Sequence, residues 1–238
     1  MRRPLSRQVR CFRSAEDGIA AVELALILPV LLTLMIGGIQ VIAYINAVRK
    51  IERVVESISQ MVSQTRPVGN SSIATVNASD LHFSFDAAMV LFPYLMAEGK
   101  RQNRSWSKVI TINYAGIIFT QTAKNCADSA DQSACYRADV SWTSIGTQQP
   151  STGPVYRPCG TPQIAADNKA PPTRTALPRS LFGPASMVVI DVEFTFTPTF
   201  GARYLPSIRI ARSAYVQPRY ATRVDYDPTN NDGIATTC

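Results

Sequence analysis

The chain has 238 residues and a formal net charge of +7. That length allows one membrane anchor and one domain of ordinary size, but not two large domains. The first 18 residues hold five Arg against Glu16 and Asp17, so the remainder carries only +4. A charge this small does not favour nucleic acid as a partner.

A basic leader, residues 1–18, precedes the longest apolar stretch of the chain. Residues 19–45 are apolar apart from Glu23, Pro29, Thr33 and Gln40. At about 1.5 Å per residue this stretch would be about 40 Å long, against about 30 Å for a hydrocarbon core. We expect a transmembrane helix that is retained, because the run is longer than that of a signal peptide. The basic leader predicts a cytoplasmic N-terminus and an exported C-terminal part.

Glu23 is the single charged residue of this helix and the fifth residue after Gly18. A carboxylate within a membrane helix costs about 2.5–3.5 kcal/mol, so it is normally paired or used. A Gly-x-x-x-x-Glu pattern that follows a basic leader and opens an apolar helix resembles the processing site of type IV prepilins. Within that group, residues 16–32 (EDGIAAVELALILPVLL) resemble the TadE-like family, minor pilins or pseudopilins of the Tad (Flp) pilus machinery.

The resemblance implies that a prepilin peptidase cuts between Gly18 and Ile19, leaving 220 of the 238 residues. It implies a single-pass protein of the bacterial inner membrane, with its C-terminal domain in the periplasm or the pilus. The implied partners are the bilayer, the peptidase, other pilin or pseudopilin subunits and pilus-assembly membrane proteins. Four residues of rise put Glu23 about 6 Å along the helix axis from the new terminus. Glu23 could therefore pair with the Ile19 amine of a neighbouring subunit; the alternative is that it lies near the headgroups.

Residues 46–66 predict an amphipathic extension of the same helix. Apolar residues recur at steps of three to four, and charged residues occupy the other faces. The apolar stripe consists of Ile45, Val48, Ile51, Val55, Ile58 and Val62. We expect it to pack on the chain's own domain, with packing on other subunits as the alternative. Pro67 and Gly69 then predict a loop.

Residues 67–238 predict one exported α+β domain with a pilin-like plan. We expect a second helix that is capped by Asp80 or Ser84 and runs to about Glu98, with a kink or a break at Pro93. Strands of an antiparallel sheet are expected over residues 108–120, 138–145, 187–197 and 208–217. The strand 187–197 alternates apolar and polar residues, which predicts one buried and one wet face.

Two segments of this domain are expected to lie outside regular structure. Lys100, Arg101 and Arg104 are interpreted as a solvated basic loop, with contact to lipid headgroups or to a partner as the alternative. Residues 147–179 hold many of the Pro and Gly residues and few apolar ones. We expect them to form a long, irregular and exposed excursion.

The five cysteines fit an exported domain. Cys11 lies in the leader, on the reducing side, and the other four lie in the exported part. Four cysteines allow three pairings. We favour Cys126 with Cys135, because the short loop closes locally, and Cys159 with Cys238 by elimination. No Cys-x-x-Cys motif or Cys/His cluster suggests a metal site.

The sequence carries little that indicates catalysis. His82 is the single histidine, and there is neither a Gly-x-Ser-x-Gly motif nor a phosphate-binding loop. Asp225–Thr229 resembles the start of a calcium loop, but Asn230 stands at the required Gly and Thr236 at the bidentate Glu, so a polar turn is expected. We therefore expect neither an enzyme nor a cofactor. The alternative function is a membrane-tethered extracytoplasmic binding or enzymatic domain.

Overall fold

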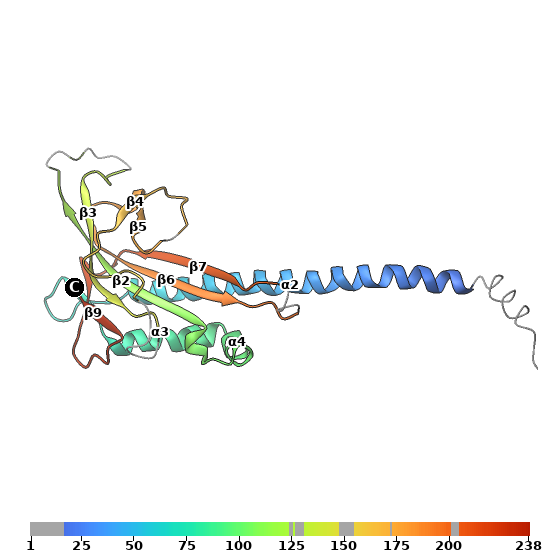
Figure 1. The fold of residues 1–238 in the computed structure, drawn as a ribbon. Coiled ribbons are helices and arrows are strands. Elements are labelled where there is room, and N and C mark those ends of the chain that lie inside the picture. The colour runs from blue at the N-terminus through green and yellow to red at the C-terminus, as the bar shows by residue number, and fades with distance from the viewer. Residues whose placement is uncertain (1–16, 124–125, 127–130, 148–154, 172, 201–204) are drawn as a thin grey trace, which may run out of the picture.

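The computed structural model describes residues 17–123, 126, 131–147, 155–171, 173–200 and 205–238, with side chains from residue 21 onward. Most of the leader, including Cys11, lies outside the described residues. A long N-terminal apolar helix is followed by a domain with further helices and an antiparallel sheet (Figure 1). The predicted α+β class is therefore confirmed.

Helix α2 (Asp17–Ser63) is one continuous helix of 47 residues, about 70 Å long. Its N-terminal half projects away from the domain, and its C-terminal half lies along the sheet (Figure 1). Pro29 lies inside the projecting half. The helix ends close to where the apolar stripe ends, since Ser63 follows Val62, the last residue of the stripe.

The predicted second helix is two helices, α3 (Ala78–Leu91) and α4 (Tyr94–Gln102). The break falls at Phe92 and Pro93, where the sequence placed it, because proline lacks the N–H that continues a helix. The cap of α3 is Asn77, so the prediction of Asp80 or Ser84 as the cap is wrong; Asp80 instead completes a capping box at the third helical position. A short 3-10 helix, η1 (Trp106–Lys108), follows.

Lys100 and Arg101 lie within α4, so the interpretation of this stretch as a solvated loop is wrong for them. Arg101 pairs with the buried Glu98 and donates a hydrogen bond to the carbonyl of Thr197. It also donates to the Tyr94 hydroxyl at 3.1 Å. These contacts join α4 to the chain just after strand β6 (Met187–Phe196), so Arg101 has a structural role.

A five-stranded antiparallel sheet forms the centre of the domain, in the order β7-β6-β2-β3-β9. Its strands are β2 (Ile110–Gln121), β3 (Tyr136–Ser144), β6 (Met187–Phe196), β7 (Ile208–Val216) and β9 (Ala235–Thr237). The first four correspond to the four predicted strands. Beside this sheet, β1 (Ile73–Val76) pairs in parallel with β8 (Arg223–Tyr226).

The helices cover one face of this sheet and form the main core with it. From α2, the stripe residues Ile51, Val55, Ile58 and Val62 are buried in this core. Phe85 of α3 and Leu95 of α4 join them, opposite Ile112, Tyr114, Val192 and Phe194 of the sheet. The C-terminal part of the stripe therefore packs on the chain's own domain, the first of the two expected alternatives.

The opposite face of the sheet is not simply wet, which corrects the prediction from the alternation in strand 187–197. The excursion contains β4 (Ile164–Ala166), paired in parallel with β5 (Ala176–Pro178), and is followed by η2 (Arg179–Leu181). Leu177 and Phe182 pack there against Ile117, Val140 and Val189 in a second core. Thr195, farther along β6, is exposed as expected, but Asp191 is only 2% exposed.

Two disulfide bonds cross-link the domain among the described residues. Cys126 is bonded to Cys135 in the connection between β2 and β3, and Cys159 to Cys238 just after β9. This is the pairing favoured from the sequence. The second bond joins the excursion to the chain end.

Candidate functional site

The projecting half of α2 presents an apolar surface with no covering from the rest of the chain. A window of 18 residues in this helix has a mean hydropathy of 2.4, and none of it is buried. Large apolar side chains from Val22 to Ile45 are 39–72% exposed. Exposed apolar area of this extent is unfavourable in water. By length and composition this half is compatible with a single-pass membrane anchor.

Two of the polar side chains in the apolar run form hydrogen bonds within the chain. The Thr33 hydroxyl donates to the Pro29 carbonyl at 2.7 Å, a bond within the helix itself. The Gln40 amide donates to the carbonyl of Phe200 at 3.0 Å and accepts from the Thr199 amide at 3.2 Å. Gln40 thus binds the segment that follows β6 to the helix, at the point where α2 meets the domain.

Glu23 differs from Thr33 and Gln40. It is exposed, and among the described residues no hydrogen bond or ion pair joins it to another group. The next charged residue along α2 is Arg49, about 39 Å away along the axis. Any partner of this carboxylate therefore lies outside the described residues.

Gly18 and Ile19 lie in the first turn of α2, so the helix is unbroken between them and Glu23. The Ile19 side chain is outside what the structure describes. The helix places residue 19 one turn from Glu23, as the sequence predicted. In the uncut chain the Ile19 nitrogen belongs to a peptide bond and carries no charge.

A buried ion pair lies in the domain, where the sequence suggested only solvent-facing residues. Arg157 Nε donates to Asp191 at 2.8 Å, and both side chains are almost fully buried. Arg157 also donates to Gln163 and to the Ala176 carbonyl. Burial raises the pKa of the Asp191 carboxyl, while the neighbouring guanidinium opposes that shift. Arg157 belongs to the excursion and Asp191 to strand β6 of the sheet. The ion pair therefore holds the excursion on the sheet.

The remaining candidates for chemistry form small polar contacts. His82 Nε2 lies 2.6 Å from Asp232 Oδ2 at the surface. Asp225 pairs with Arg223 on β8, and the Asp227 carboxylate accepts from the Thr229 amide at 2.9 Å, which makes a local turn. Within the described ranges, no group of three His, Cys, Asp or Glu residues could hold a metal ion.

The fold defines a class: a chain with one long apolar N-terminal helix, compatible with a single-pass anchor, that carries an α+β domain. A family model described as TadE-like protein matches residues 18–57. This match confirms the resemblance drawn from the sequence, and the N-terminal region of the chain is TadE-like. It supports a role associated with the Tad pilus. Comparison with curated proteins and with solved structures gave no match.

The matched residues begin at Gly18 and end in the half of α2 that packs on the sheet. They include Ile19, Glu23, Gln40 and the projecting half from Gly18 onward. The sheet and the excursion lie beyond the match.

Proposed function

We propose that this chain is a minor pilin or pseudopilin that takes part in assembling a Tad (Flp) type IVb pilus or a related secretion apparatus. A prepilin peptidase would first cut between Gly18 and Ile19. The observation that carries the proposal is Glu23, a carboxylate on an exposed apolar helix that has no partner among the described residues. Thr33 and Gln40, polar residues of the same run, have their hydrogen bonds inside the chain.

The proposed chemistry is non-covalent and uses the helix geometry. Cleavage would create a positively charged amine at Ile19, about 6 Å along the helix axis from Glu23. When two such helices pack in a membrane, the carboxylate of one subunit can pair with the amine of its neighbour. The pairing offsets the cost of about 2.5–3.5 kcal/mol for each buried charge and fixes the stagger between subunits.

The proposed setting follows from the same helix. Before assembly the protein would lie in the bacterial inner membrane, with the leader in the cytoplasm and the α+β domain in the periplasm. The basic leader supports this orientation. In this proposal the peptidase acts on the chain as a substrate, and the chain itself is not an enzyme.

The test replaces Glu23 by Gln, which keeps the shape of the side chain and removes its charge. We expect Glu23→Gln to lower the amount of protein recovered with the pilus subunits at least about tenfold, because an ion pair in lipid is lost. Its membrane level and its cleavage should stay unchanged. Immunoblots of sheared pilus and membrane fractions measure all three quantities.

Glu56→Gln is the matched control. It makes the same substitution in the same helix, at an exposed residue whose side chain accepts a hydrogen bond from Gln60 at 3.1 Å. This variant should assemble at the wild-type level. If Glu23→Gln does so too, the pairing between subunits is refuted.

A further inference from the structure

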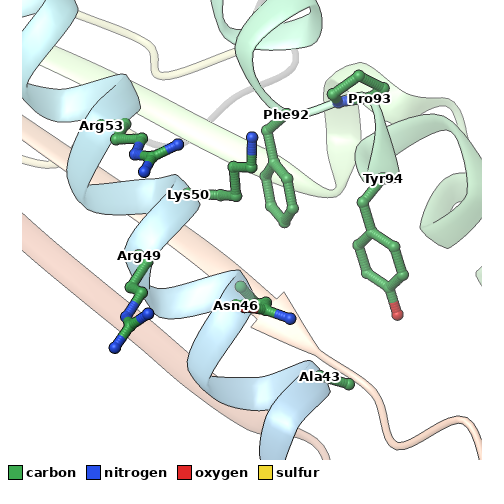
Figure 2. A pocket seen from close by; sticks show the side chains of 9 residues that line it. Ala43, Asn46, Arg49, Lys50, Arg53, Phe92, Pro93 and Tyr94 are labelled. Carbon is green, nitrogen blue, oxygen red and sulfur yellow. The ribbon is translucent and has the colours of Figure 1, made fainter.

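A groove with a volume of about 580 Å³ lies between α2 and the junction of α3 with α4 (Figure 2). Asn46, Lys50 and Arg53 line its α2 side, and their spacing puts them on one helix face. Phe92, Pro93 and Tyr94 form the opposite wall. Figure 2 shows Lys50 directed from α2 toward Phe92. The groove is thus cationic on one side and largely apolar on the other.

The cations of the groove have no acidic partner among the described residues. Arg49, Lys50 and Arg53 form no ion pair there, although Glu52 and Glu56 belong to the same stretch of helix. Glu52 pairs instead with Arg212 of β7 at 3.3 Å. Glu56 accepts from Gln60. The groove therefore has an excess of positive charge that an anion can neutralise.

Helix geometry puts this groove beside the outer surface of the membrane that α2 would span. A hydrocarbon core that begins at Ile19 ends about 20 residues later, near Gln40. Ala43 and Asn46, at the near end of the groove, then lie about 5–10 Å beyond it, at the depth of the headgroups. Long side chains on a helix lean toward its N-terminus, so Lys50 and Arg53 reach back toward the same level.

Three cations at this place act against the usual charge bias of membrane proteins. Lys and Arg close to a span favour the cytoplasmic side, and the leader supplies that signal here with five Arg. Arg49, Lys50 and Arg53 would lie near the other end of the span. The topology of the chain therefore does not account for positive charge at that end.

We propose that this groove binds the phosphate of an anionic phospholipid headgroup in the outer leaflet. The inference rests on the membrane anchoring of α2 that is part of the proposed function. Lys50 and Arg53 supply the charge, and the Asn46 amide supplies a hydrogen bond. Ala43 and Pro93 contact the apolar part of the lipid. Because α2 is part of the domain core, the bound lipid fixes the orientation of the domain relative to the membrane surface.

Tyr94 forms part of the neutral wall of this site and is held in place from α4. Its hydroxyl accepts a hydrogen bond from Arg101 at 3.1 Å and donates its own proton toward the Glu98 carboxylate. Burial and the nearby Glu98 raise the pKa of Tyr94, so the hydroxyl keeps this proton at neutral pH.

The test uses the full chain, uncut, in phosphatidylcholine nanodiscs that contain trace spin-labelled phosphatidylglycerol or phosphatidylcholine. Electron paramagnetic resonance measures the fraction of each label that the protein immobilises. We expect the wild type to prefer phosphatidylglycerol. Lys50→Gln should lower that preference about fivefold, the effect of removing one cation at an anionic site. Lys50→Arg should keep it.

Lys169→Gln is the matched control, since it removes the same charge from an exposed lysine of the excursion. It should leave the preference unchanged. The proposal is overturned if the wild type shows no preference for phosphatidylglycerol. It is also overturned if Lys50→Gln and Lys169→Gln both keep the wild-type preference. A preference abolished by 10 mM inorganic phosphate, but not by equal ionic strength of chloride, overturns the lipid assignment in favour of a soluble anion. The assay contains neither peptidase nor pilus, so a negative result counts against the groove and leaves the assembly proposal standing.

Discussion

At the scale of single residues, the attachment of the excursion depends on Arg157. Its guanidinium contacts the Asp191 carboxylate, Gln163 and the Ala176 carbonyl. We expect Arg157→Met to lower the free energy of unfolding by about 3–5 kcal/mol, because it leaves Asp191 buried and uncompensated. Urea unfolding of the full chain in detergent micelles, followed by near-UV circular dichroism, measures this change.

The double variant Arg157→Met/Asp191→Leu distinguishes an unpaired charge from a loss of packing. Replacing both partners by apolar groups is close to neutral in many proteins, so the double variant should recover most of the loss. A single variant that stays within about 1 kcal/mol of the wild type would mean that Arg157 does not hold the excursion.

Residue patterns singled out Glu23 but gave no sign of the Arg157–Asp191 pair. Glu23 stands out in the sequence because everything near it in the helix is apolar. Asp191 lies in a strand whose alternation marks it as solvent-facing, and Arg157 lies in a segment rich in Pro and Gly. The partners are 34 residues apart, and nothing local in either segment signals the other. The two residues are brought together only by the tertiary packing of the excursion on the sheet.

At the scale of elements, the two disulfides should contribute unequally to stability. Cys126–Cys135 spans 9 residues and Cys159–Cys238 spans 79. Loop-closure entropy predicts about 2.5 kcal/mol for the first bond and about 4.5 kcal/mol for the second. The variant Cys159→Ser/Cys238→Ser should therefore unfold about 2 kcal/mol more easily in urea than Cys126→Ser/Cys135→Ser. Equal losses, or the reverse order, would contradict this prediction.

Elements with a long periodic pattern were predictable, and short elements were not. The strands β6 and β7 have nine to ten residues, enough for the alternation to show. The strands β1, β4, β5, β8 and β9 have three or four residues each, too few to establish a period. They form because another segment of the same chain lies beside each of them and supplies hydrogen-bonding partners.

At the scale of the whole molecule, α2 has two halves with different surroundings. Its C-terminal half is part of the main core, and its N-terminal half is apolar and uncovered. Gln40 marks the boundary through its bonds to Thr199 and Phe200. The TadE-like match runs across this boundary. Packing of further copies or related subunits around the uncovered half would bury the exposed apolar surface that the domain leaves open.

The account depends most on a free amine at Ile19. Determining the N-terminal residue of the protein from its native, pilus-producing cells tests this directly. We predict that intact mass and N-terminal sequencing give a chain that starts at Ile19 and lacks the first 18 residues. Gly18→Ala should retain the leader. Native protein that starts at Met1 or Arg2 while pili are being made would contradict the account, because the amine that Glu23 requires would then be absent.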